Sequence, residues 1–516
     1  MNQQAKIRGL QDESPGERSA GIGVHFSSLA GPHGIGDIGD SARSFVDTLA
    51  RCKIGFWQFL PTGPTAYGDS PYQPLSAFAG NEMLIGINPL VRQGLLSPAD
   101  ADNFAGLSRT SVDYGQLIPQ KHAVLELAAK RFRTRADTSL KSAYEDFLHQ
   151  HDDHWLEDYA VYRLLKTMHG ERPWPEWDAS FVHRENDAMH KVADSNRDNI
   201  GQIKVIQFLF DQQWRVLKQY ANENGIRLFG DMPIYIALDS ADAWANREIL
   251  LIDQDGVPSH VAGVPPDYFS ADGQLWGNPL YDWKLHESSG FQWWIERMQH
   301  ATNQLDLVRI DHFRGFEAFW SVPYGAETAR DGEWVPGPGD GLFDALGAAL
   351  GKTPIVAEDL GVITPGVDEL RHRHQIPGMK VLQFEVADPY FNPDEIAVDC
   401  VCYTGTHDND TTLGWFNGGD RDTRSAEEIL ETSQNALRLT GGAPATIHLD
   451  MIRLAFNSQA KLAIAPLQDF LGLGSEARMN IPGTTLNNWR WRVTEEQLSA
   501  EFCDSVADLV EKTSRF

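Results

Sequence analysis

The chain has 516 residues, of which 42% are hydrophobic and 22% charged, values typical of a soluble globular protein with a large core. Its formal net charge is −28, from 72 acidic and 44 basic residues, which argues against nucleic acid or an anionic membrane as a partner. No apolar run is long enough for a signal peptide or a membrane-spanning helix, so the sequence predicts a cytoplasmic protein without a membrane partner.

Eight short apolar runs are predicted to be strands. They cover residues 21–26, 56–61, 227–235, 305–313, 353–361, 378–384, 400–408 and 462–470. Helix-like stretches separate most of these runs, and eight alternations of strand and helix predict an α/β fold, a (β/α)8 TIM barrel. Such barrels reach about 400 residues or more when they carry insertions. We therefore expect residues 1–516 to form a single catalytic barrel.

Two gaps between predicted strands exceed the roughly 30 residues of a plain strand–helix unit. The first contains residues 75–200, whose helical periodicity at 120–133, 142–149 and 155–168 predicts a largely helical insertion after strand 2. The second, residues 240–300 after strand 3, includes the stretch 263–283, which is rich in Gly, Pro and aromatic residues and predicts an active-site lid loop. Both insertions follow strand ends, so they should stand over the C-terminal face of the barrel.

Charged side chains recur where the predicted strands end. In chain order they are Asp231, Arg309, Asp311, Glu358, Asp359, His407 and Asp408. In a barrel these ends converge over one mouth. Crowded carboxylates push their pKa values apart, so one can serve as an acid and another as an ionised nucleophile, as glycoside chemistry requires. Arg309 lies two residues before Asp311, on the same strand face, where it would keep that carboxylate ionised.

Other interpretations of these residues stay open at this point. Adjacent Glu358 and Asp359 point to opposite faces of a strand, so one of them is structural, and the pattern does not say which. The acids also fit a barrel that binds Mg²⁺ to stabilise an enolate, with Lys380 as its base, although Lys380 lies inside a strand. Cys400 and Cys402 have no further ligand at metal spacing and are expected to be buried thiols.

Aromatic residues in the loops favour a sugar over a small metal-bound acid, because sugar rings stack on aromatic faces. These aromatic residues are Tyr72, Tyr268, Phe269 and Trp276. Structural roles compete here too: Asp408 is also compatible with a helix cap, and His407 with a packed core histidine. Tyr72 is equally compatible with the end of a turn, and Trp276 with core packing beneath a loop.

Seven motifs occur in order along the chain. They are GDSPYQ (68–73), FGDMPIY (229–235), GVPPDYFS (263–270), RIDHFRGF (309–316), AEDLG (357–361), THDND (406–410) and RMNIPG (478–483). With these motifs the chain resembles the 4-α-glucanotransferases called amylomaltases or disproportionating enzymes, relatives of the α-amylases. The likeness covers most of the chain. It implies transfer of α-1,4-glucan segments from a maltooligosaccharide donor to the 4-hydroxyl of a glucose or glucan acceptor, with no cofactor and no metal.

The resemblance also implies residue roles. Asp311 would be the nucleophile that forms a covalent glucosyl-enzyme, and Glu358 would protonate the leaving O4 and then activate the acceptor. Asp408 would bind hydroxyls of the sugar at the scissile bond. The residues implied to bind substrate are Tyr72, Asp231, Arg309, His407, Trp276, Asn480 and, in the lid, Asp267, Tyr268 and Phe269.

The bond broken and the bond made are both α-1,4, so the reaction retains configuration. Retention predicts that the carboxyl groups of Asp311 and Glu358 lie roughly 5–5.5 Å apart. An α-glucan hydrolase on the same scaffold is the alternative activity. A glucan-binding protein on a disabled barrel is a further alternative, against which the presence of all three acids argues. The sequence leaves the oligomeric state open.

Overall fold

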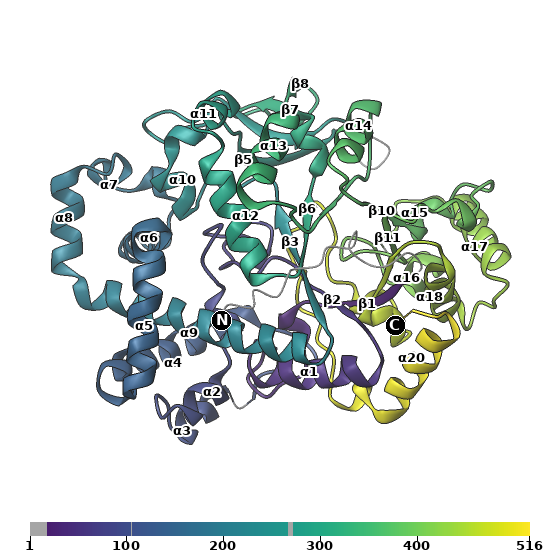
Figure 1. Ribbon diagram of the computed structural model, residues 1–516, viewed down its shortest axis with the longest axis horizontal. Coiled ribbons are helices and arrows are strands. Elements are labelled where there is room, and N and C mark those ends of the chain that lie inside the picture. The colour runs from purple at the N-terminus through teal and green to yellow at the C-terminus, as the bar shows by residue number, and fades with distance from the viewer. Residues whose placement is uncertain (1–17, 105, 267–271, 420, 516) are drawn as a thin grey trace.

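The computed structural model describes residues 18–515 except 105, 267–271 and 420. Its centre is an eight-stranded parallel sheet in the order β10–β11–β12–β1–β2–β3–β6–β9 (Figure 1). The strands are β1 (Ser19–Gly23), β2 (Phe56–Gln58), β3 (Arg227–Pro233), β6 (Leu307–Asp311), β9 (Ile355–Ala357), β10 (Gly378–Val381), β11 (Cys400–Tyr403) and β12 (Leu462–Pro466). Each lies within or overlaps one of the eight predicted runs. The predicted TIM-like barrel is therefore confirmed.

The barrel closes between β9 and β10. The N–H of Ala357 donates to the carbonyl of Pro377 at 2.8 Å, and the N–H of Met379 donates to Oδ1 of Asp359, also at 2.8 Å. Asp359 also forms an ion pair with Arg371, with 3.3 Å between Oδ2 and Nε. Asp359 therefore stabilises the seam of the barrel, and of the two adjacent acids it is the structural one.

Buried apolar side chains fill the ring of strands. One cluster comes from the barrel strands: Phe56, Phe229, Leu307, Val356, Met379, Val381, Val401, Tyr403, Leu462 and Ile464. Intervening strand residues such as Val308 and Ala463 belong instead to the larger core that includes the surrounding helices. This two-residue alternation is the pattern expected when one strand face lines the barrel and the other packs against helices.

Amphipathic helices cover the barrel. On α1 (Asp40–Arg51), for example, Ala42, Phe45, Val46 and Leu49 are buried at helical spacing. The other barrel helices are α9 (Arg197–Glu223), α12 (Gln292–Gln304), α13 (Asp340–Leu350), α14 (Pro365–Arg373), α15 (Leu382–Glu385), α16 (Thr412–Asn417), α17 (Ala426–Thr440), α18 (Ile447–Asn457), α19 (Leu467–Phe470) and α20 (Ala500–Lys512).

The long segment between β2 and β3 is helical, and Figure 1 shows α4–α8 together on one side of the barrel. Its helices before α9 are α2 (Ile87–Arg92), α3 (Pro98–Ala101), α4 (Tyr114–Arg135), α5 (Thr138–His151), α6 (Glu157–Met168), α7 (Ala179–Val182) and α8 (Asn186–Ser195). A separate apolar cluster that includes Trp174, Trp177 and Trp244 packs part of this segment. The boundary of the insertion at 75–200 stays a prediction.

A second, four-stranded antiparallel sheet has the order β5–β4–β7–β8. Its strands are β4 (His260–Val264), β5 (Gln274–Pro279), β7 (Ala318–Pro323) and β8 (Glu333–Pro336), and α10 (Ala241–Ala245) and α11 (Trp283–Ser288) flank β4 and β5 in the chain. Where the sequence predicts a loop over 263–283, the structure therefore has the end of β4 and all of β5, with Trp276 on a strand. β4 pairs with β7, which lies far along the chain, and this pairing stabilises both strands. The periodicity of a local sequence does not reveal such a long-range pairing. Asp267, Tyr268 and Phe269 lie outside the described residues.

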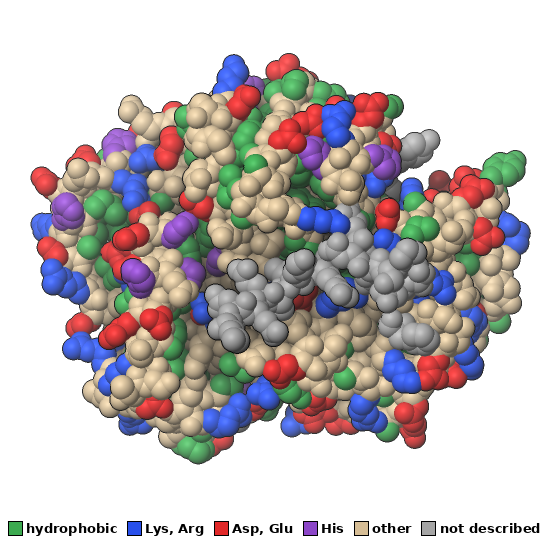
Figure 2. All heavy atoms as spheres, viewed as in Figure 1, with side chains coloured by type: hydrophobic (Ala, Val, Ile, Leu, Met, Phe, Trp, Pro, Cys, Tyr) green, Lys and Arg blue, Asp and Glu red, His purple; other side chains and the backbone are tan. Residues whose placement is uncertain are grey.

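Acidic and basic side chains are both scattered over the face drawn in Figure 2. The four cysteines, Cys52, Cys400, Cys402 and Cys503, are buried and free, as expected for Cys400 and Cys402. Within the described residues, no helix is both long enough and apolar enough to cross a lipid bilayer.

Candidate active site

Strand alternation places the predicted polar residues above the apolar filling of the barrel. On β6, Leu307 belongs to the inner cluster, and Arg309 and Asp311 follow it at two-residue steps. Asp231 follows Phe229 on β3 in the same way. The side chains that succeed the inner apolar layer are therefore charged, and they stand at the C-terminal mouth of the barrel.

Arg309 connects two of the predicted carboxylates. This arginine is 4% exposed, and its Nη2 lies 2.8 Å from Oδ1 of Asp311. Its Nη1 donates to Oδ2 of Asp231, and Tyr72 donates its hydroxyl to that same oxygen at 2.5 Å. The other oxygen of Asp231 is buried and has no partner among the described groups.

Glu358 is held by the turn that follows β6. Its Oε2 accepts the N–H of His312 at 2.8 Å, and its Oε1 accepts the N–H of Leu360 at 2.9 Å. His312 has φ of 55°, in the left-handed region, where a residue other than glycine carries strain of about 1–3 kcal/mol. Because His312 directly follows Asp311, this hydrogen bond brings the carboxyl of Glu358 next to the end of β6.

Asp408 follows β11, and its side chain is 48% exposed. Asn480 donates its Nδ2 to Oδ1 of Asp408 at 2.7 Å, and Nη2 of Arg478 donates to the backbone carbonyl of Asp408 at 2.7 Å. His407 lies on the other side, with 3.4 Å between its Nε2 and Oδ2 of Asp408. The carboxylate is thus held in one orientation although solvent reaches it.

Two aromatic residues complete the group. The rings of Tyr72 and His407 are stacked, with centroids 5.0 Å apart and an interplanar angle of 16°. Trp276 meets the ring of His312 edge to face at 4.7 Å. The structure therefore joins the predicted residues that it describes into one chain of contacts. In contact order they are Asn480, Asp408, His407, Tyr72, Asp231, Arg309, Asp311, then through His312 both Glu358 and Trp276.

The pKa values of the two central acids rise together. Burial raises the pKa of Asp311 well above its ordinary value, against the effect of Arg309, and repulsion from Asp231 and Glu358 adds to the rise. Burial also raises the pKa of Glu358, whereas Arg309 and the two backbone N–H donors oppose it. The carboxyls therefore resist ionising together. Arg309, which contacts Asp311 directly, opposes the rise at Asp311.

Histidine residues of the site are neutral near pH 7. Burial lowers the pKa of His407 below its ordinary value and that of His312 to about 3. Neutral imidazoles offer one donor and one acceptor each, which suits recognition of sugar hydroxyls.

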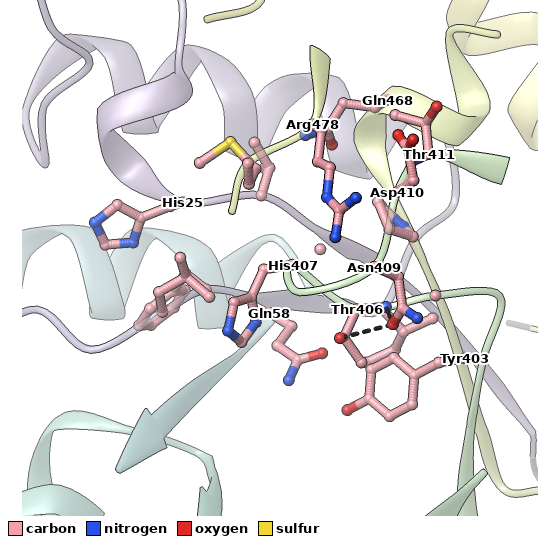
Figure 3. Close-up of a pocket in the computed structure, with 18 of the residues that line it drawn as sticks. His25, Gln58, Tyr403, Thr406, His407, Asn409, Asp410, Thr411, Gln468 and Arg478 are labelled. Atoms are coloured by element: carbon pink, nitrogen blue, oxygen red, sulfur yellow. Dashed lines mark hydrogen bonds between the residues drawn. The ribbon is translucent and has the colours of Figure 1, made fainter. Parts of the chain in front are cut away.

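A cavity opens beside the acids, at the ends of β1, β2, β11 and β12. It meets the acid group through Arg309 and His407, whereas Asp311, Glu358 and Asp408 do not line it. Figure 3 shows the guanidinium of Arg478 extending toward His407 and Asn409. The wall residues that sequence reasoning missed include His25, Gln58, Tyr403, Gln468 and Arg478. Of these, only Arg478 belongs to a motif, RMNIPG, that could have drawn attention to it.

The donor set suits a ligand rich in hydroxyls. It offers carboxylates, a guanidinium, a phenol and an amide around one mouth. Among the described residues, no group of three or more His, Cys, Asp or Glu could hold a metal ion. Lys380, the base that an enolate mechanism would need, is 51% exposed and pairs with Glu385 at 3.4 Å.

Comparison with known proteins gives consistent matches over nearly the whole chain. A family model described as 4-alpha-glucanotransferase matches residues 24–498. The 4-alpha-glucanotransferase of a Synechocystis strain is 46% identical over 490 residues, which are 94% of this chain and 95% of that protein. The 4-alpha-glucanotransferase of Thermus thermophilus is 43% identical over 503 residues, 96% of this chain and 99% of that protein.

Solved structures agree in fold. The amylomaltase from Streptococcus agalactiae in complex with acarbose superposes with a TM-score of 0.91 at 36% identity, covering 97% of this chain and 100% of that one. The amylomaltase from Corynebacterium glutamicum has a TM-score of 0.76 at 19% identity, over 96% of this chain and 75% of that one, and shows the shared fold.

Proposed function

The chain belongs to the 4-alpha-glucanotransferase family, and from this premise we propose how its residues carry out the reaction. The activity is that of a 4-alpha-glucanotransferase, or amylomaltase, which binds α-glucan oligosaccharides. We propose that the donor is a maltooligosaccharide or another α-1,4-glucan, and that the acceptor is the 4-hydroxyl of glucose or of a glucan. The cytoplasmic location expected from the sequence stays a prediction.

In the first step the carboxylate of Asp311 attacks the anomeric carbon of the donor. The bond between that carbon and O4 breaks as the proton of Glu358 passes to O4, and the shortened glucan departs. Arg309 supports this step because its contact at 2.8 Å favours the ionised form of Asp311. Two backbone N–H groups donate to the two oxygens of Glu358, so the carboxyl group and the proton that it transfers have a defined orientation.

In the second step Glu358 takes the proton from the 4-hydroxyl of the acceptor, whose oxygen attacks the anomeric carbon from the opposite side. The bond to Asp311 breaks, and its carboxylate is regenerated. The observation that carries this proposal is the hydrogen bond from the N–H of His312 to Glu358, since it joins the acid to the residue after the nucleophile. The spacing we expect between the two carboxyls is about 5–5.5 Å, that of retaining enzymes.

The remaining contacts support a proposed position for the substrate. We propose that Asp408, oriented by Asn480, binds hydroxyls of the sugar at the scissile bond. Tyr72 and His407 would border the same sugar, and Asp231, which accepts the hydroxyl of Tyr72, would complete this subsite. Trp276, packed on His312, would contact a sugar further along the glucan from the cleaved bond.

One incubation tests the proposal. With maltotriose as the only substrate, the enzyme should produce glucose together with a series of longer maltodextrins, and added EDTA should leave this pattern unchanged. An enzyme that yields only shorter products would be a hydrolase instead. The variant Asp311→Asn should lose turnover, and full turnover by that variant would remove Asp311 from the nucleophile role.

A further inference from the structure

Three consecutive residues of the turn after β6 hold the segment that carries Glu358. His312 donates its N–H to Oε2 of Glu358 at 2.8 Å, and Phe313 donates its N–H to the backbone carbonyl of Glu358 at 3.2 Å. Arg314 reaches further along, and its Nη1 donates to the carbonyl of Val362. The turn therefore fixes both the beginning and the end of the segment 358–362.

The far end of this segment depends on the arginine. Val362 is 57% exposed, and the segment between β9 and α14 has no helix or strand of its own among its described residues. The side chain of Arg314 is only 6% exposed, so a buried cation anchors an exposed length of irregular chain. Irregular segments with few backbone hydrogen bonds open at low free-energy cost, and an anchor of this kind restricts that motion.

The second sheet holds the arginine in place. The ring of Trp334, on β8, lies over the guanidinium with 3.8 Å between Cζ and the ring centroid. Glu317, in the same turn, lies 4.0 Å from Nη2 of Arg314. Arg314 therefore connects β8 with the segment of Glu358, through a planar group that meets an aromatic face and a carbonyl at once.

We propose that Arg314 is a positioning residue for the general acid–base step, which it serves by fixing segment 358–362 so that the carboxyl of Glu358 meets the departing oxygen. This inference rests on the role proposed above for Glu358. The positioning role of Arg314 differs from that of a sugar-binding residue, because Arg314 contacts the segment that carries Glu358.

The dependence of kcat/KM on the leaving group distinguishes a residue that positions the acid from one that binds sugar. With a glucan donor, the bond from the anomeric carbon to O4 breaks only as Glu358 supplies a proton to O4. With α-maltosyl fluoride, the bond from carbon to fluorine breaks and fluoride departs with the electron pair as an anion, while the bond to Asp311 forms. A residue that places Glu358 should therefore matter for the first donor and little for the second, as judged by kcat/KM for the donor.

The experiment compares Arg314→Met and Arg314→Lys with the wild type on maltotriose and on α-maltosyl fluoride. A correctly placed general acid contributes about 10²–10⁴-fold, so partial misplacement in Arg314→Met should reduce kcat/KM for maltotriose about 10–100-fold. The loss with the fluoride should stay below about threefold, because little protonation is needed. Arg314→Lys keeps a donor for Val362 without the planar contact on Trp334. Its kcat/KM for maltotriose should therefore lie between that of the wild type and that of Arg314→Met.

Arg371→Met is the matched control. Arg371 is 13% exposed, pairs with Asp359 at 3.3 Å and donates to the carbonyl of Ile376 at 3.1 Å, so it is also a largely buried guanidinium, and it contacts the residue that follows Glu358. Because it serves the seam of the barrel, its loss should lower the melting temperature and change kcat/KM for both donors by the same factor.

Glu358→Gln tests the acid role of Glu358 separately from the positioning role of Arg314. If Glu358→Gln loses the same factor with both donors, the acid role of Glu358 fails and the proposed mechanism with it. If Glu358→Gln depends on the leaving group but Arg314→Met does not, the role of Arg314 alone is overturned. Should Arg314→Met fail to fold, Arg314→Lys carries the same comparison, and equal losses with the two donors would again overturn the inference.

Discussion

Asn480→Ala tests how the exposed carboxylate of Asp408 is kept in position. The mutation removes a hydrogen bond of 2.7 Å from Nδ2 to Oδ1 of Asp408. Hydrogen bonds to charged groups contribute about 1.5–3 kcal/mol when buried. The side chain of Asp408 is 48% exposed, so water replaces part of the lost interaction. We therefore expect a loss of about 1 kcal/mol, or about fivefold in kcat/KM, with little change in stability.

A double-mutant cycle measures whether Asn480 acts through Asp408 or by touching sugar itself. Initial rates with α-maltosyl fluoride are determined for the wild type, Asn480→Ala, Asp408→Asn and the double variant, because an activated donor keeps slow variants measurable. If Asn480 orients Asp408, its substitution should cost almost nothing once Asp408 is Asn, and the coupling should be about 1 kcal/mol. An undiminished fivefold loss in the Asp408→Asn background would refute the reasoning and assign Asn480 a direct contact with substrate.

Two further predictions concern the centre of the site. Asp311→Asn should abolish turnover yet raise the melting temperature near pH 8, because the raised pKa of Asp311 means that the folded protein binds this proton more tightly than the unfolded chain does. The wild type loses this stabilising proton as the pH rises through the raised pKa, and near pH 4 it still holds the proton. The difference in melting temperature between Asp311→Asn and the wild type should therefore vanish near pH 4, and calorimetry at the two pH values checks the sign. Tyr72→Phe removes the hydroxyl that donates to Asp231 at 2.5 Å but keeps the stack on His407, and kcat should fall about tenfold or more. Tyr72→Ala should lose more, and equal kcat values for the two variants would assign the effect to the hydroxyl alone.

Strand β6 shows what local sequence can establish. A parallel strand buried on both faces is a nearly continuous apolar run, so β6 and its seven partners are recognisable without any knowledge of their neighbours. The two-residue period of a strand also fixes that Arg309 and Asp311 share the face of Leu307. The contact between this arginine and this aspartate was therefore predictable from the spacing alone.

The second sheet shows where local pattern fails. β8 is mostly exposed, and its residues have no apolar alternation that would distinguish a strand from a loop. β4 pairs with β5 nearby and also with β7, across a long stretch of intervening chain that includes β6 itself. The stretch 263–283 therefore has the composition of a loop although β5 occupies part of it.

The sequence by itself determined the barrel strands, the faces of their residues and, through its motifs, the family. The resemblance implied the catalytic role for Glu358, and the tertiary structure added that Asp359 serves the seam, because that depends on how the ring closes between β9 and β10. The tertiary structure also decided that Asn480 orients Asp408 and that Arg314 reaches Val362. Periodicity reports how one segment of backbone faces its surroundings, whereas these contacts depend on register and closure, which are properties of the whole barrel.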